Sequence, residues 1–89
     1  MFYKSKNIVI KNRTFKVKFR AEWRGRLCEC IIYELVRPAW KIFKYKYLDE
    51  VYFMIEEYHS IESGLTRMVI NYLQKESFEK EIKDKWANI

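Results

Sequence analysis

Residues 15–23 read Phe-Lys-Val-Lys-Phe-Arg-Ala-Glu-Trp, an unbroken alternation of apolar and charged side chains. Because successive side chains of a β-strand point to opposite faces, this period of two predicts a strand with two chemically different faces. The apolar face holds Phe15, Val17, Phe19, Ala21 and Trp23. The charged face holds Lys16, Lys18, Arg20 and Glu22.

Turn signals flank this strand on both sides. Upstream, residues 8–10 form a short apolar run and Lys11-Asn12-Arg13 is a turn candidate, so residues 7–23 are expected to form a hairpin. Downstream, Arg24-Gly25 predicts a tight turn, since glycine tolerates the positive φ that hairpin turns demand. The next strand is expected at residues 27–36.

The register of the second hairpin follows from charge. A turn at Arg24-Gly25 sets Arg20 opposite Glu29, whereas a turn at Gly25-Arg26 sets Glu22 against Glu29, a repulsive pair. We therefore expect the first register. Both registers add Cys28, Cys30, Ile32 and Val36 to the apolar face. Both leave Leu27, Ile31, Tyr33 and Leu35 beside the cations, although a three-residue loop would exchange the two faces.

A further strand is expected at residues 40–47, after a turn at Arg37-Pro38. One of its faces carries only aromatic side chains and is expected to face the core: Phe43, Tyr45 and Tyr47. The other face carries Trp40, Ile42, Lys44 and Lys46.

From Asp49 onwards the period changes to three and four residues, which is typical of an amphipathic helix with Asp49 as its N-cap. The apolar positions are Val51, Ile55, Tyr58, Ile61, Leu65, Met68 and Tyr72. Gly64 is expected to divide the pattern into helices of about 49–60 and 63–75, with a single helix that tolerates the glycine as the alternative. Ser77 is a candidate cap for a last helix, whose Phe78, Ile82 and Trp86 are expected to be buried within the chain or across a dimer contact. The expected fold class is thus α+β, with an antiparallel meander of three or four strands followed by two or three helices packed on one face.

The length of the chain and the distribution of its charges limit the possible domain organisation. Eighty-nine residues predict one domain, 1–89. The net charge of +6 is divided unequally: residues 1–48 carry thirteen Lys or Arg against three acids, and residues 49–89 carry five against nine. The first half is therefore expected to be a basic sheet and the second an acidic helical half. A one-sided positive field attracts polyanions or acidic protein surfaces.

Residue types that support catalysis or metal binding are sparse. Cys28 and Cys30 lie two apart on one strand face, too far for an unstrained disulfide, and are expected to be reduced core thiols, with an intermolecular disulfide or a shared metal site as the alternative. His59 has no nucleophile in a recognisable setting and is expected near the end of the first helix, while Glu56-Glu57 diverge on that helix. The sequence therefore predicts no enzymatic activity, no cofactor and no metal site. Apolar runs are too short for a membrane-spanning helix or signal peptide, and a cytoplasmic location is expected.

The strongest functional signal is a group of basic and aromatic side chains on the sheet face opposite the expected core. Nucleic-acid surfaces combine cations for phosphates with flat rings for bases, and this face supplies both. The candidate nucleic-acid-binding residues are Lys16, Lys18, Arg20, Arg24, Arg26, Tyr33, Trp40, Lys44 and Lys46. The leading expectation is a small non-enzymatic nucleic-acid-binding protein, with phosphate-backbone contacts to DNA or RNA. The alternative is a protein-binding inhibitor or regulator of phage or mobile-element origin that engages an acidic protein surface, either as a monomer or as a homodimer.

Overall fold

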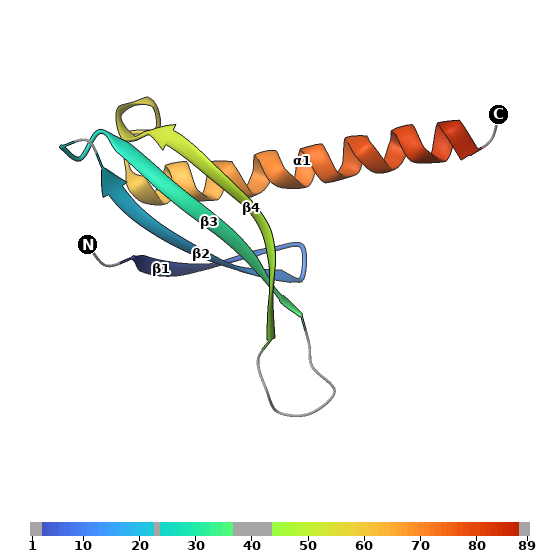
Figure 1. Ribbon diagram of the computed structural model, residues 1–89, viewed down its shortest axis with the longest axis horizontal. Helices are drawn as coiled ribbons and strands as arrows, with labels where there is room; N and C mark the ends of the chain where they lie inside the picture. Colours follow the sequence, from blue (N-terminus) through green and yellow to red (C-terminus); the bar gives the residue numbers. More distant parts are fainter. Residues whose placement is uncertain (1–2, 23, 37–43, 88–89) are drawn as a thin grey trace.

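The computed structural model describes residues 3–22, 24–36 and 44–87. Four strands form one antiparallel sheet in the order β1-β2-β3-β4: β1 (Lys4–Ile10), β2 (Arg13–Glu22), β3 (Leu27–Val36) and β4 (Lys44–Met54). A short 3-10 turn, η1 (Ile55–Glu57), leads to the α-helix α1 (Ile61–Ala87), which packs on one face of the sheet (Figure 1). The α+β class is confirmed. The expected count of two or three helices is wrong, since the described part of the chain has one α-helix.

Two tight turns set the registers of the first three strands. Lys11 and Asn12, with φ of 48° and 66°, join β1 to β2. Arg24 and Gly25, with φ of 57° and 78°, lie in the turn between β2 and β3. Positive φ at both central residues is typical of the type I′ turn, whose twist matches that of the flanking strands. Arg20 pairs with residue 29, so the register predicted from charge is confirmed.

The segment expected to begin a helix at Asp49 is the second half of β4. Asp49 pairs with Ile32 in the ladder and caps no helix. Val51 and Phe53 pair with the two cysteines of β3 and point towards the core, so the apolar period here is two. The apolar spacing of this segment also fits a helix. It forms a strand because its backbone groups are hydrogen-bonded to β3 in the ladder. The sheet consequently extends to Met54, and the boundary expected at residue 48 falls inside β4.

A β-bulge at Leu48 reverses the faces of the first half of β4. Ile32 pairs with residue 49 while Tyr33 pairs with Tyr47, so Leu48 is the extra residue between them. An extra residue shifts the alternation by one position. Tyr45 and Tyr47 therefore lie on the face away from α1, and the prediction that they face the core is wrong. Lys44 and Lys46, which pair with Val36 and Glu34, lie on the helix side instead of the outward face, and Phe43 lies outside the described residues.

The helix begins after Ser60, whose side-chain oxygen accepts a hydrogen bond from the backbone N–H of Ser63 at 3.1 Å. This is the N-cap geometry in which a side chain satisfies a free N–H of the first turn. Gly64 lies inside α1 and does not divide it, so the helix does tolerate the glycine, but it begins at Ile61 and not at residue 49. Ser77 starts no new helix, and His59 lies in the loop between η1 and α1 with φ of 63°, not within a helix.

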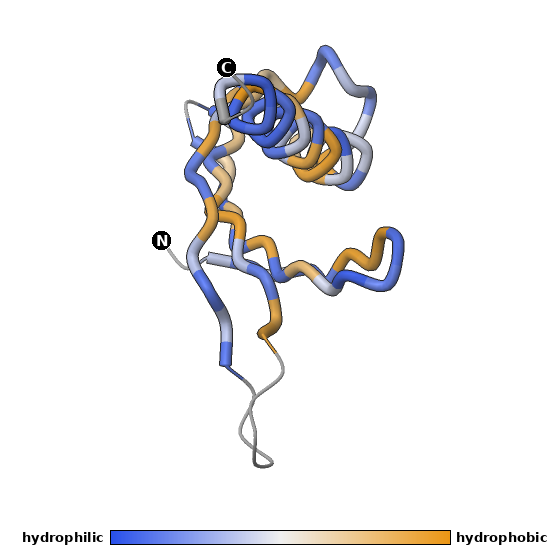
Figure 2. Tube along the Cα trace, turned by 90° about the vertical axis from the view of Figure 1, so that its right-hand side faces the viewer, coloured by the Kyte–Doolittle hydropathy of each residue, from blue (hydrophilic) through white to orange (hydrophobic). Residues whose placement is uncertain are grey.

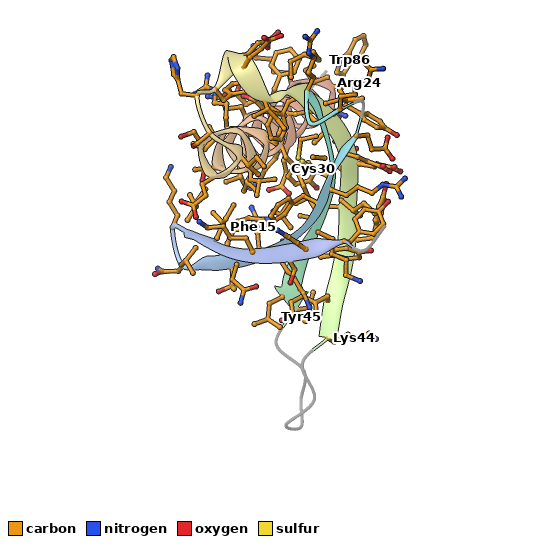
Figure 3. All side chains as sticks on the ribbon, turned by 90° about the vertical axis from the view of Figure 1, so that its left-hand side faces the viewer. Phe15, Arg24, Cys30, Lys44, Tyr45 and Trp86 are labelled. Carbon is orange, nitrogen blue, oxygen red and sulfur yellow. The ribbon has the colours of Figure 1, made fainter. Side chains whose placement is uncertain are left out.

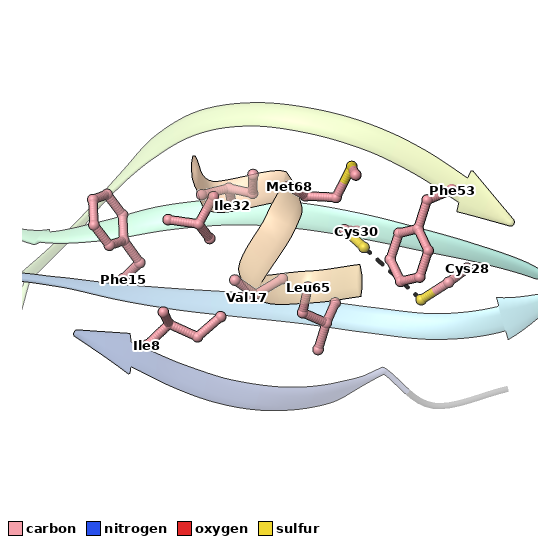
Figure 4. Close-up of a cluster of buried hydrophobic side chains, with 10 residues drawn as sticks. Ile8, Phe15, Val17, Cys28, Cys30, Ile32, Phe53, Leu65 and Met68 are labelled. Atoms are coloured by element: carbon pink, nitrogen blue, oxygen red, sulfur yellow. Dashed lines mark hydrogen bonds between the residues drawn. The ribbon is translucent and has the colours of Figure 1, made fainter. Parts of the chain in front are cut away.

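The core lies between α1 and the sheet (Figure 4). Its buried apolar residues come from all four strands and from the first half of the helix: Ile8, Phe15, Val17, Cys28, Cys30, Ile32, Phe53, Leu65, Met68 and Val69. The Cys28 and Cys30 sulfurs are 3.8 Å apart as free thiols, and burial raises the pKa of both. Their expected place in the core is confirmed, and Figure 4 shows both cysteines in the same buried cluster as Phe15.

A charged cluster closes the core at one end. Arg13 of β2 donates from Nε to Glu34 of β3 at 2.8 Å and from Nη1 to Glu76 of α1 at 2.7 Å. Its guanidinium lies 5.3 Å from the centre of the Phe15 ring. This cluster thus joins two strands and the helix through one side chain, and bidentate guanidinium–carboxylate pairs fix geometry as well as charge.

The cluster predicts an acid-sensitive step in stability. The Arg13 hydrogen bond holds the pKa of Glu76 below its ordinary value of 4.5. A carboxylate whose folded pKa is lowered contributes stability at neutral pH, and the contribution is lost as pH falls below the ordinary value and through the folded one. We expect the free energy of unfolding, measured by urea titration, to fall over this acid range in the parent protein. In Glu76→Gln it should fall less. Glu79→Gln, which alters an exposed helix position, is the control, and equal acid sensitivity in all three proteins would contradict the prediction.

Candidate nucleic-acid interface

The face of the sheet opposite α1 carries no described helix. In Figure 2, which looks along the helix, α1 lies against one side of the curved sheet. We call the opposite side the outer face. Its members follow from strand alternation and pairing. They are Tyr3, Ser5, Asn7, Val9, Thr14, Lys16, Lys18, Arg20, Glu22, Leu27, Glu29, Ile31, Tyr33, Leu35, Tyr45, Tyr47, Glu50, Tyr52 and Met54.

At one end of the outer face, lysines and tyrosines interleave. We call this group the Lys–Tyr patch: Lys16, Lys18, Tyr33, Tyr45 and Tyr47. The Lys16 ammonium lies 5.0 Å from the centre of the Tyr45 ring, and the Lys18 ammonium lies 5.4 Å from the Tyr33 ring. Tyr33 meets Tyr47 edge to face at 6.1 Å between ring centroids. These contacts hold the lysine ammonium groups over the rings while the Tyr45 and Tyr47 side chains remain 37% and 55% exposed.

At the other end of the outer face, Arg20 is held by carboxylates. It donates from Nε to Glu29 at 2.8 Å and from Nη2 to Glu22 at 2.7 Å. The Tyr3 hydroxyl donates to Glu29 at 3.2 Å, and the Arg20 guanidinium lies 4.8 Å from the Tyr3 ring. The Arg20 hydrogen bond lowers the pKa of Glu29. Arg20 is thus part of a closed network that orders the sheet, and its charge is largely balanced.

The outer face is therefore divided electrostatically. Glu50 and Tyr52 lie on β4 near the Arg20 network, and the Glu29 and Glu50 carboxylates raise the pKa of Tyr52. Within the described ranges, neither Lys16 nor Lys18 has a carboxylate at ion-pair distance. The uncompensated positive charge of the face is concentrated on the Lys–Tyr patch.

The structure brings together only part of the predicted site. Lys16, Lys18, Arg20 and Tyr33 share the outer face. Arg24 and Arg26 are exposed in the turn between β2 and β3. The bulge places Lys44 and Lys46 on the helix side, and Trp40 lies outside the described residues. Figure 3 shows Lys44 and Tyr45 at the end of β4 furthest from the labelled core residues.

The sequence pattern predicts a core position for Tyr45 and Tyr47, two tyrosines of the patch. Their residue type indicates an outward position, because a tyrosine hydroxyl needs water or a polar partner and a phenylalanine ring does not. The fully buried large side chains of this protein include Phe15 but no tyrosine among the described residues. Residue type was therefore a better guide here than period.

Other site types have little support. Among residues 3–22, 24–36 and 44–87, no group of three His, Cys, Asp or Glu side chains could hold a metal ion. No helix in this described part is long and apolar enough to cross a membrane. Comparisons with protein-family models, curated proteins and solved structures found no match to this chain.

Proposed function

We propose that this protein binds single-stranded nucleic acid through the Lys–Tyr patch, without catalysis. The observation that carries the proposal is the interleaving of two lysines, unpaired among the described residues, with partly exposed tyrosine rings on an uncovered sheet face. Lys16 and Lys18 would contact phosphates, and the rings of Tyr45 and Tyr47 would stack against bases. Stacking on aromatic rings beside a positive groove is the general mode of single-strand binding.

The width of the sheet favours a single strand over a duplex. Neighbouring strands lie about 4.8 Å apart, so four strands span roughly 14 Å between the outer backbones. The major groove of B-DNA is about 12 Å wide and admits a helix or a two-stranded ribbon. The outer face of this sheet is therefore too broad to enter the groove, whereas unstacked bases can lie on it.

The lysines and the tyrosines should contribute differently to binding. For Lys16→Ala/Lys18→Ala, we expect weaker binding to a fluorescent oligothymidylate and to an oligouridylate alike, measured by anisotropy over a salt series. The slope of log K against log salt should fall by about 1.4, since each phosphate neutralised on a single strand contributes about 0.7. Tyr47→Ala should weaken binding by roughly 1–3 kcal/mol with little change in slope, because it removes stacking and no charge.

Matched controls lie on the same chain. Lys44→Ala/Lys46→Ala removes two exposed lysines from the helix side of the sheet and should leave the slope nearly unchanged. Tyr47→Phe keeps the ring and should bind nearly as the parent does. If the Lys16/Lys18 variant binds as tightly as the parent at low salt, the Lys–Tyr patch is not the binding face.

A protein partner is the second candidate. The observation that favours it is the Arg20 end of the outer face, where Tyr3 and Tyr52 are 39% and 55% exposed and the arginine is paired with glutamates. Tyrosine and arginine are enriched at protein interfaces, while uncompensated lysine is depleted. Purified protein that carries no nucleic acid, by its absorbance ratio at 260 and 280 nm, and that binds neither oligonucleotide would favour this candidate.

A further inference from the structure

The second half of α1 extends beyond the sheet (Figure 1). Every side chain from Ser77 to Trp86 is exposed. Phe78, Ile82 and Trp86, expected to be buried, are 62%, 39% and 72% exposed, so their burial within the chain is ruled out. Because they recur at every fourth residue, they form one apolar row along the helix. Three large apolar side chains in a row on a projecting helix form a surface that association with a partner would remove from water.

Charged residues border this row on both sides. With about 3.6 residues per turn, Glu79 and Lys83 lie along one border, and Glu81 and Lys85 lie along the other. Each border therefore carries a carboxylate towards the start of the helix and an ammonium towards its end. When two copies of such a border run in opposite directions, the carboxylate of each lies beside the ammonium of the other.

We propose that the projecting half of α1 pairs with the same segment of a second copy of this chain, antiparallel and crossing at Ile82. In this arrangement Phe78 packs near the partner's Trp86. Each border meets the same border of the partner in reverse, so Glu79 approaches the partner's Lys83 and Glu81 approaches the partner's Lys85.

The opposite orientation is disfavoured by the same charges. In a parallel pair each border meets the other border in register. Glu79 then approaches the partner's Glu81, and Lys83 approaches the partner's Lys85. Like charges at this distance are destabilising, and opposite charges set partner choice and orientation between helices. In the antiparallel pair, like charges approach only at the crossing, where Glu81 and Lys83 lie beside their own copies.

Charge also argues against other occupants of the row. Residues 78–86 carry Glu79, Glu81 and Asp84 against Lys80, Lys83 and Lys85, so this segment is neutral. A neutral segment has no net attraction to an anionic membrane or to nucleic acid. The contact is also short, since eleven residues, from Ser77 to Ala87, span about 16 Å of helix. An interface of this length is smaller than a standard stable one, so the dimer should be reversible and depend on concentration.

The apolar row can be tested by sedimentation equilibrium from roughly 10 μM to 1 mM, a range suited to a modest dissociation constant. The parent protein should shift from monomer to dimer. Ile82→Glu should remain monomeric throughout, while Lys80→Gln, which makes the same change in net charge at an exposed position on the opposite side of the helix, should behave as the parent. A parent protein that stays monomeric over this range, or an Ile82→Glu variant that dimerises normally, would overturn the proposal.

The orientation can be tested with two charge exchanges that share one substitution and leave net charge unchanged. Glu79→Lys/Lys83→Glu reverses one border, which remains complementary to its own reverse, so dimerisation should persist. Glu79→Lys/Lys85→Glu makes one border entirely basic and the other entirely acidic. Antiparallel pairing then places like charges together along both borders, and the dimer should be lost. Tighter dimerisation of this second variant would show a parallel pair. Circular dichroism of both variants checks that the helix is intact, and neither result depends on nucleic-acid binding.

Discussion

Phe15→Ala is expected to lower the free energy of unfolding by about 3–5 kcal/mol. The Phe15 side chain is fully buried, and it lies in the core layer between the sheet and α1. Truncation loses the transfer free energy of the ring and leaves a cavity that the rigid ladders of β1 and β3 on either side cannot fill. It also removes the surface on which the Arg13 guanidinium lies. The loss should therefore fall at the upper end of the range for core substitutions.

Urea unfolding followed by circular dichroism measures this change. Phe78→Ala is the matched control, because it removes the same ring from a position that is 62% exposed. At concentrations where the protein is monomeric, this control should change the free energy of unfolding by less than about 0.5 kcal/mol. Similar losses for the two phenylalanines would mean that Phe15 is not a core residue.

Gly64→Ala is expected to destabilise the protein by about 3 kcal/mol, although alanine is the better helix former. Gly64 is buried where α1 approaches β4, and a Cβ atom here would fall on the Phe53 ring, 2.8 Å from Cδ2 and closer still to Cε2 and Cζ. The helix would have to move away from the sheet or the ring would have to leave its rotamer, and overpacking of this kind costs about 1–3 kcal/mol or more. Alanine's intrinsic gain of about 1 kcal/mol is too small to offset the loss of helix–sheet contact.

The Phe53→Leu background tests whether overlap with the aromatic ring causes this loss. If it does, Gly64→Ala should cost much less in that background than in the parent, and the two substitutions should be strongly non-additive. If the losses in the free energy of unfolding are additive, the Gly64→Ala loss arises elsewhere in α1 and not from overlap with the Phe53 ring. Gln74→Ala, at an exposed position of the same helix, should be close to neutral or slightly stabilising.

The pattern of residues 13–36 was sufficient to predict the centre of the sheet. Strict alternation along β2, the Arg24-Gly25 turn and the opposite charges of Arg20 and Glu29 each act between near neighbours in the sequence, and all three favour one register. The same register correctly placed Phe15, Val17 and the cysteines in the core, and Lys16, Lys18 and Tyr33 on the outer face. When local signals agree in this way, no distant part of the chain is needed to choose between alternatives.

The tertiary structure decided the other features of the fold, because they depend on contacts between segments that are distant in the sequence. Residues 49–54 have apolar spacing compatible with a helix, and only the ladder with β3 makes them a strand. The bulge at Leu48 follows from fitting β4 to β3, and it exchanged Tyr45 and Tyr47 with Lys44 and Lys46 between the two faces. Gly64 would commonly interrupt a helix, but the close approach of Phe53 gives it a packing role within α1. The sequence alone therefore determined that Lys16, Lys18 and Tyr33 would share a sheet face turned away from the core. Which rings and lysines of β4 join them depended on the β3–β4 pairing, since a one-residue shift reverses every side chain of a strand.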